Sequence, residues 1–285
     1  MPPSPSNPPP KIFDQTLLAL ARARAAKRQS RNGTSFIYIR AAEDAASRIV
    51  DIKRQFERAV LVGTVDGRTT ILSNLPDNRK PAQFDHVATP EELDGPYDLI
   101  LSLLELQSDE ALPQTLMTLR ATLAPDGLLL AATLGGDTLT ELRQSLYAAD
   151  QQVLGGAAAR VYPMVDYSQA AMLLGRVGFA LPVVDSDRVT VHYGAIDTLV
   201  ADLRDLGVSN VLAARDRRAL PRRWLEILRK VYAENFSRDD GKRRATFEIL
   251  WLTGWVPHES QQKPLKPGSA KMRLADALKT QERKI

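Results

Sequence analysis

The chain contains no cysteine, and this absence removes several kinds of chemistry at once. Without thiols there are no disulfides, no thiolate metal ligands and no cysteine nucleophile, and the composition fits a reducing compartment. The sequence also lacks an apolar run near the roughly 20 residues that a membrane span requires. It has neither the apolar core of a signal peptide nor the arginines of a transit peptide. We therefore expect a cytoplasmic protein with no transmembrane segment.

Histidine is also scarce, and His86, His192 and His258 show no metal-ligand spacing, so no metal site is expected. The chain has no P-loop and no GxGxxG fingerprint. Its formal net charge of +4 is small. A basic run with one tryptophan at 215–229 is more typical of a solvated helix than of an RNA contact. We therefore expect no nucleic-acid partner.

The length of 285 residues favours one large α/β domain. Residues 1–10 are rich in proline and are expected to form a disordered leader, while 261–285 form a basic polar tail. The segment 11–260 is interpreted as the folded domain. It opens with two amphipathic helices, expected over 12–28 and 39–56. The basic side of the first is interpreted as a solvated face rather than as a membrane or nucleic-acid surface.

The segment 96–146 predicts a strand, a helix, a second strand and a second helix. Its apolar runs at 98–101 and 128–134 are typical of strands that are buried on both faces. A crossover of about a dozen residues joins parallel strands in a doubly wound sheet. Ligands of such sheets bind beyond the carboxyl ends of the strands, which are expected at 102–107 and 135–137.

These residues also carry a resemblance. The segment is similar to the fourth and fifth strands of class I S-adenosylmethionine-dependent methyltransferases, whose intervening helix ends in an LxPDG turn. GGDTLTELRQSL, DRVTVHY and TFEILWLTGWVPHESQQKPLKPGSAKMRLADAL resemble one branch more closely. That branch contains alphaproteobacterial methyltransferase-domain proteins, a mitochondrial complex I assembly factor and the malonyl-carrier methyltransferase of the biotin pathway. The resemblance extends from Ile12 to Leu278.

The resemblance implies an α/β fold with a Rossmann-like, mostly parallel sheet and an antiparallel last strand. We expect its strands at 59–63, 98–101, 128–134, 188–193 and 244–252. Only about 30 positions separate Gly67 from Asp98, which is the length of a single βαβ unit. The sheet is therefore expected to be truncated between its first and fourth strands. Short strands at 84–88 and 70–73 are the candidates for this interval.

The second half of the chain predicts further helices and strands. A helix over 166–178 is expected to end at Gly178, and others are expected over 196–206 and 224–236. The apolar runs at 182–184 and 188–193 are interpreted as a hairpin whose turn is Asp185-Ser186-Asp187.

In relatives of this type, a glycine-rich loop after the first strand approaches the amino-acid part of S-adenosylmethionine, which is the cofactor that the resemblance implies. Gly63, Asp66 and Gly67 match that loop. Ser102 at the end of a neighbouring strand completes the set, together with Asp85 as a substitute for the acid that binds the ribose hydroxyls.

Three positions depart from the family pattern. Leu61 stands where relatives have an acid, and its neutral side chain cannot accept hydrogen bonds from an ammonium group. The truncated interval leaves Asp85 as a poor match for the ribose-binding acid. Gln107-Ser108 replaces a His-Trp pair of the relatives. Binding of S-adenosylmethionine is therefore expected to be weakened or lost.

The segment Gly135-Gly136-Asp137-Thr138, with Glu141, follows the second apolar run and has two interpretations. The glycines can let a substrate approach the backbone, with Asp137 orienting or deprotonating it. Alternatively the glycines form a turn, and Asp137 and Thr138 cap the next helix in a capping box that includes Glu141.

Trp255, His258, Ser260 and Gln261 follow the last predicted strand and match a family signature. They either line a substrate pocket or belong to a loop that is pinned onto the sheet. We expect the sheet to bring them to the same side as Asp137, which would make Asp137 and His258 the catalytic pair.

Two functions remain open at this point. The first is a methyltransferase with weakened cofactor binding, acting on a protein or a small acid, since methyl transfer depends mostly on proximity and alignment. The alternative is a factor that does not methylate and instead binds a protein client, of the complex I assembly or arginine-modifying type that the resemblance implies. The partner is accordingly a protein client or a small-molecule methyl acceptor.

Overall fold

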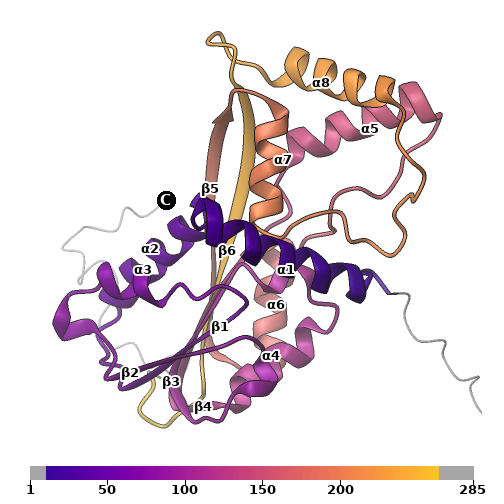
Figure 1. Ribbon diagram of the computed structural model, residues 1–285. Coiled ribbons are helices and arrows are strands. Elements are labelled where there is room, and N and C mark those ends of the chain that lie inside the picture. Colours follow the sequence, from indigo (N-terminus) through magenta and orange to yellow (C-terminus); the bar gives the residue numbers. More distant parts are fainter. Residues whose placement is uncertain (1–10, 263–285) are drawn as a thin grey trace, which may run out of the picture.

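The computed structural model describes residues 11–262, which contain one six-stranded sheet in the order β2-β1-β3-β4-β6-β5 (Figure 1). β1 to β4 are parallel, whereas β6 is antiparallel to both of its neighbours. This confirms the predicted Rossmann-like sheet with an antiparallel last strand. The strands are β1 (Arg58–Val62), β2 (Gln83–Val87), β3 (Tyr97–Leu103), β4 (Leu123–Leu134), β5 (Ala180–Tyr193) and β6 (Arg243–Trp255).

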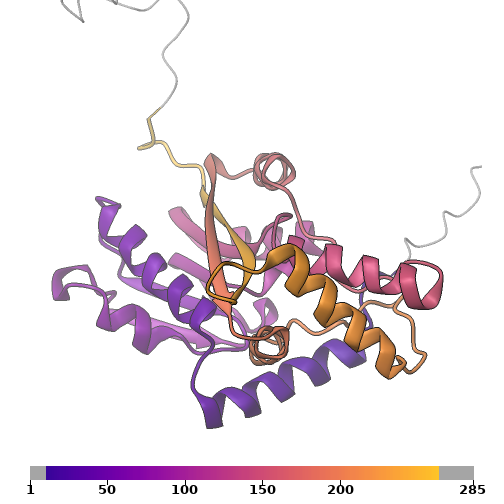
Figure 2. The same cartoon turned by 90° about the horizontal axis from the view of Figure 1, so that it is seen from above.

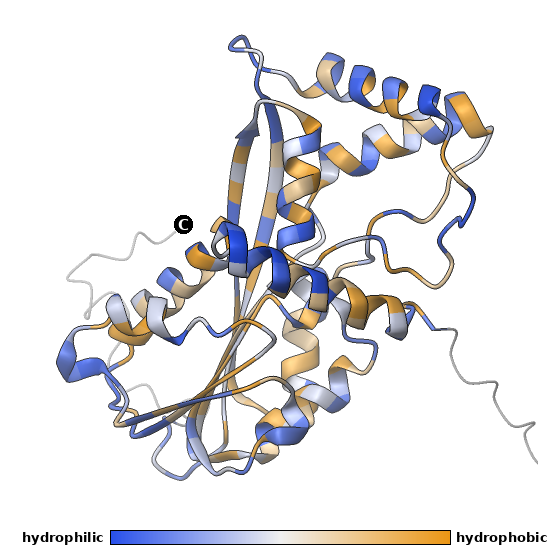
Figure 3. Ribbon diagram, viewed as in Figure 1, coloured by the Kyte–Doolittle hydropathy of each residue, from blue (hydrophilic) through white to orange (hydrophobic). Residues whose placement is uncertain are grey.

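Helices cover both faces of the sheet, and their apolar sides face it (Figure 3). α2 packs on one face, and α4 and α6 pack on the other (Figure 2). α5 lies beside α8, where β5 and β6 extend past the other strands (Figure 1). α1 lies across the carboxyl ends of β1 and β3. The helices are α1 (Gln15–Asn32), α2 (Phe36–Asp51), α3 (Arg68–Ser73), α4 (Leu112–Ala121), α5 (Thr140–Leu154), α6 (Tyr167–Val177), α7 (Ile196–Asp205) and α8 (Arg222–Phe236).

The predicted truncation is confirmed in the interval between Gly67 and Asp98. In this part of the described chain β2 is the one strand that precedes β3, and it lies within one residue of the predicted 84–88. The prediction of a strand at 70–73 is wrong, because these residues lie in α3. The carbonyl of Thr70 accepts hydrogen bonds from Ser73 Oγ at 2.9 Å and Asn74 Nδ2 at 2.8 Å, which close the helical turn.

The predicted hairpin at 182–193 is also wrong, since this segment forms the single strand β5. Two arginines of α2 neutralise the acids that suggested a turn. Arg48 donates to both carboxylate oxygens of Asp185, at 2.7 and 2.6 Å, and Arg40 donates twice to Asp187, at 3.0 and 2.8 Å. The charged residues therefore remain in the strand, because a neighbouring helix supplies their partners.

Other predictions have simpler outcomes. The helix ending at Gly178 is confirmed, with an Asp166–Gln169 capping box at its start and a φ of 89° at Gly178. The predicted leader at 1–10 and the tail from 263 onward lie outside the described residues. Within residues 11–262, every helix is too short or too polar to span a membrane.

Candidate functional site

A cleft opens beyond the carboxyl ends of β1 and β3, where the sheet topology predicts a ligand site. Its volume is ≈ 390 Å³. Gly63 at the end of β1 and the buried Ser102 of β3 lie in its wall, as predicted. The loop after β2 forms a second side, and α1 closes the third with Leu18 and Arg22. We call this space the cleft below.

Glu105 occupies the corner of the cleft where β1 ends. Its Oε1 accepts the backbone N–H of Thr64 at 2.7 Å, and its Oε2 lies 3.1 Å from Arg22 Nη2. The same Nη2 donates to Ser108 Oγ at 3.3 Å. A Cβ at Gly63 would lie 2.9 Å from Glu105 Cγ, and the φ of this glycine is +153°. The glycine therefore admits a carboxylate of the same chain.

The predicted loop residues after Gly63 are already engaged by neighbouring side chains. Asp66 accepts hydrogen bonds from Arg68 Nε at 2.9 Å and Nη2 at 2.8 Å, and this guanidinium holds the pKa of Asp66 below its usual range. The ring of Tyr38 lies against Gly67, and its hydroxyl donates to the Val65 carbonyl at 2.8 Å. Burial raises the pKa of Tyr38, so the hydroxyl stays protonated. The loop is thereby packed onto α2.

Asp85 does not reach the carboxyl end of its strand. It lies opposite Val60 in the middle of β2, where it accepts a hydrogen bond from Gln83 Nε2 at 2.8 Å and lies 3.8 Å from Arg58 Nε. This position does not favour the predicted role of Asp85 in binding the ribose hydroxyls. Register explains this outcome, because the described cleft wall at the end of β2 is formed by Ala88 and Thr89.

The residues present do not fit S-adenosylmethionine. The Thr64 N–H, which could bind the carboxylate of the cofactor, is bound to Glu105. Leu61 is fully buried in β1 and offers no charge to an ammonium group. Gln107 is buried and donates through Nε2 to the Leu104 carbonyl, so it serves the local backbone. Weakened binding of S-adenosylmethionine therefore stays a prediction.

The Gly135–Glu141 segment is fastened to β6. A Cβ at Gly135 would lie 2.6 Å from Glu248 Oε2, and Thr138 Oγ1 both donates to and accepts from the backbone of Glu248, at 3.1 and 3.0 Å. Glu141 is buried and accepts the Thr246 N–H at 3.0 Å. The predicted capping box is wrong, because these side chains bind a strand and the N-cap of α5 is Leu139.

Asp137 and Gly136 lie at the outer edge of this segment. Asp137 pairs with Arg188 of β5, and its N–H donates to Glu248 Oε2 at 2.9 Å. The space beside Gly136 is open, with no atom within 4 Å of a Cβ built there. Asp137 is therefore exposed and ion-paired, which is a weak setting for a general base.

The expected meeting of Asp137 and His258 does not occur. β6 is antiparallel to β4, so Trp255 pairs with Leu128, six residues before the carboxyl end of β4, whereas Asp137 follows that end. The intervening strand spans about 20 Å at roughly 3.3 Å per residue. The prediction of one shared face is wrong for the whole second group, whose members are Trp255, His258, Ser260 and Gln261.

At that opposite end the second group forms a pinned loop. Gln261 Nε2 donates to Asp126 Oδ1 and to the Val256 carbonyl, both at 2.8 Å. His258 Nδ1 and Ser260 Oγ share a hydrogen bond of 2.7 Å in an exposed position. These contacts favour the structural interpretation of the segment. Within residues 11–262, histidines and acids form no group of three that could hold a metal ion.

Comparison with known proteins gives the family. No protein-family model matches the chain. The chain is 32% identical to "Arginine-hydroxylase NDUFAF5, mitochondrial" of Danio rerio over 293 residues, which cover 94% of this chain and 90% of that protein. The chain belongs to the NDUFAF5 family. Its sheet, with parallel strands followed by the antiparallel β6, is of the Rossmann-like methyltransferase type.

The chain is also similar, more distantly, to two methyltransferases. The malonyl-[acyl-carrier protein] O-methyltransferase of Laribacter hongkongensis is 32% identical over 174 residues, which cover 61% of this chain and 56% of that enzyme. Among solved structures, a phosphoethanolamine N-methyltransferase of Haemonchus contortus in complex with S-adenosyl-L-methionine has a TM-score of 0.43 at 12% identity. The aligned region covers 82% of this chain and 60% of the chain in that structure.

For this NDUFAF5-family chain, sequence reasoning missed Glu105 and Arg22. Glu105 interrupts the apolar residues that follow β3, and an acid in such a position is a usable signal of a buried partner. Arg22 follows Leu18 at helical spacing and therefore lies on the buried side of α1. Leu104 has a left-handed backbone conformation, with a φ of 56°, which turns Glu105 toward the cleft. No pattern in the sequence predicts this conformation at a leucine.

Proposed function

We propose that this chain is a client-binding factor on a methyltransferase scaffold, and that its cleft recognises an arginine side chain in place of S-adenosylmethionine. The observation that carries this proposal is the Arg22 guanidinium, which binds Glu105 and Ser108 inside the cleft. An arginine of the same chain thus serves as an internal example of the ligand. The planar guanidinium with its five N–H donors suits such a carboxylate-lined site.

The charge of the cleft supports this choice of ligand. Among the described residues of its lining, Arg22 is the only cation, and the acids are Glu91, Glu105, Asp109 and Glu110. A second guanidinium would therefore find carboxylates beside the one that Arg22 binds, although Asp109 and Glu110 each also accept a backbone N–H, from Ala111 and Phe13. Charge-assisted hydrogen bonds of this kind are among the stronger polar contacts in proteins.

The internal pair is weak enough to be exchanged. The side chains of Arg22 and Glu105 are 37% and 19% exposed. Ion pairs that water reaches contribute about 0.2–1 kcal/mol. A client arginine therefore has to overcome at most about a fivefold competition from Arg22. The name of the mitochondrial relatives, arginine-hydroxylase, also supports an arginine-containing protein client of the complex I assembly or arginine-modifying type.

Calorimetric titration of a Gly-Gly-Arg-Gly-Gly peptide tests the proposal, with the citrulline peptide as its neutral control. We expect the arginine peptide to bind at least tenfold more tightly than the citrulline peptide. Arg22→Met should strengthen binding by up to about fivefold, because it removes the internal competitor. Arg24→Met changes an exposed arginine of the same helix and should have no effect.

Glu105→Gln completes the test, since it removes the charge but keeps the shape of the site. Binding should weaken by up to about fivefold, because an ion pair that water reaches contributes about 0.2–1 kcal/mol. Equal binding of the two peptides, or binding that Glu105→Gln leaves unchanged in a folded protein, would refute the proposal.

A second candidate is S-adenosylmethionine-dependent methyl transfer to a protein or small acid. The specific observation in its favour is the cleft itself, which keeps a volume of ≈ 390 Å³ at the carboxyl ends of β1 and β3. For this function the Arg22–Glu105 pair would have to open. Low-micromolar binding of S-adenosylmethionine to the unaltered chain would favour this candidate.

A further inference from the structure

A second cavity lies apart from the cleft, between α5, α7 and α8. Its volume is ≈ 340 Å³, and it shares no lining residue with the cleft. Its walls are mostly aliphatic and aromatic. The lining side chains include Leu139, Leu146, Arg160, Arg204 and Trp224. Small-molecule sites have this character, with mostly apolar walls and a few placed polar groups.

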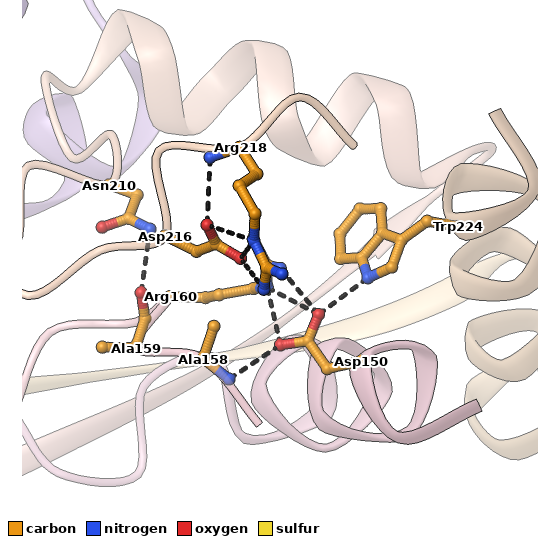
Figure 4. Close-up of polar contacts among 8 residues, drawn as sticks. All are labelled: Asp150, Ala158, Ala159, Arg160, Asn210, Asp216, Arg218 and Trp224. Carbon is orange, nitrogen blue, oxygen red and sulfur yellow. Dashed lines mark hydrogen bonds and ion pairs between the residues drawn. The ribbon is translucent and has the colours of Figure 1, made fainter. Parts of the chain in front are cut away.

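One wall of this cavity is held rigidly by a buried carboxylate. Asp150 is fully buried and accepts hydrogen bonds from Trp224 Nε1 at 2.7 Å, from Arg160 Nε and Nη2 and from the Ala158 N–H at 3.0 Å (Figure 4). The Arg160 guanidinium also lies over the Trp224 ring, 4.7 Å from its centroid. Both lining side chains therefore have fixed positions, as a preorganised binding site requires.

The floor of the cavity contains a strained residue. Leu139 has a φ of 59°, in the left-handed region that leucine rarely adopts. Its N–H donates to the Thr246 carbonyl at 2.7 Å, and its side chain is buried while lining the cavity. Strain of this kind persists where the surrounding structure imposes it, and it gathers at ligand sites.

The charge at the rim selects the ligand. None of the described lining residues is acidic, and Arg160 is already neutralised by Asp150. Arg204 is exposed on α7 and makes no ion pair with any residue of the described chain. It therefore leaves one uncompensated positive charge beside an apolar space. A ligand that complements both features has a single negative head and an apolar body.

We infer that this cavity binds a free aliphatic monocarboxylate. A water molecule takes about 30 Å³ in the liquid, so the cavity holds roughly ten groups of that size. Octanoate has this size, and its tail matches the apolar walls while its carboxylate can reach Arg204 at the rim. The inference is independent of the proposed arginine site, because it rests on other residues and another ligand.

Calorimetric titration of the full chain with octanoate, and separately with octanol, tests this inference. Octanoate should bind about three- to fivefold more tightly than octanol, as expected for one partly exposed charge contact. Arg204→Gln should remove that difference, whereas Arg223→Gln, which removes an exposed arginine of α8 outside the cavity, should preserve it. Binding should also alter the fluorescence of Trp224.

A second pair of variants separates the cavity from the protein surface. Leu146→Trp fills the cavity from a half-buried position and should weaken the binding of both octanoate and octanol at least tenfold. Tyr147→Trp adds the same side chain at a 57% exposed position and should change neither affinity. Equal affinity for octanoate and octanol, or affinity that a folded Leu146→Trp protein retains, would overturn the inference. So would binding that appears only after residues 263–285 are removed, because that segment would then be the occupant.

Discussion

Replacement of Asp150 by asparagine should destabilise the fold more than any other single loss of a carboxylate in its surroundings. The side chain is fully buried, and Arg160 and Trp224 both donate to it. An asparagine keeps the shape but cannot neutralise Arg160, whose side chain is only 11% exposed. It also turns an NH2 group toward donors, so at least one polar group is left unsatisfied.

The magnitude follows from this burial. Removal of one partner of a buried ion pair costs about 3–5 kcal/mol, because an uncompensated charge remains. For a chain of this length such a loss lowers the melting temperature by roughly 5–12 °C. Asp197→Asn is a matched control, since it breaks the Asp197–Arg229 pair, whose side chains are 58% and 47% exposed. Exposed pairs contribute about 1 kcal/mol or less.

The assay is urea unfolding at pH 7 and at lower pH. Burial alone raises the pKa of Asp150, but the hydrogen bonds from Arg160 and Trp224 outweigh it and leave that pKa below its ordinary value. The stabilisation is therefore complete above the ordinary aspartate pKa and is lost as the pH falls through the lowered value. The variant should lose this part of the acid dependence. A cost below about 1 kcal/mol at pH 7 would refute the reasoning.

Three further outcomes are expected. Gly135→Ala should cost about 1–3 kcal/mol in urea unfolding, because its Cβ would lie 2.6 Å from Glu248 Oε2. Arg48→Met should cost about 1 kcal/mol and speed amide hydrogen exchange in β5, because Asp185, whose side chain is 43% exposed, loses both of its Arg48 hydrogen bonds; unchanged exchange would contradict this. Tyr38→Phe should cost about 0.5–1.5 kcal/mol in thermal unfolding, because the Val65 carbonyl loses its donor.

Much of the fold could be predicted from local pattern. The apolar runs that form β3 and the second part of β4 are short, which is typical of strands that are buried on both faces. The short stretch of chain before β3 limits the number of strands that can precede it. The hairpin prediction failed because a sequence pattern does not show that Arg48 and Arg40 of α2 neutralise Asp185 and Asp187. Tertiary ion pairs overrode a local turn signal.

The candidate site was less predictable, because it depends on the direction of the last strand and on one strained backbone conformation. An antiparallel last strand returns the chain to the opposite edge of the sheet, so Asp137 and His258 diverge although both match family patterns. Gly63 and Ser102 were placed in the cleft because they end parallel strands. The placement of Glu105 depends on a left-handed Leu104, which no side-chain periodicity reports.

The central claim is that the cleft takes a guanidinium and no longer takes the cofactor of its superfamily. Calorimetric titration of the unaltered chain with the arginine peptide and with S-adenosylmethionine under the same conditions tests it most directly. With two or more charge-assisted hydrogen bonds missing, each worth about 1.5–3 kcal/mol, the cofactor should bind at least about a hundredfold more weakly than to an intact methyltransferase. The peptide should bind measurably, and its affinity should not change when the cofactor is present. Low-micromolar binding of S-adenosylmethionine by a chain that gives no heat with the peptide would contradict the account.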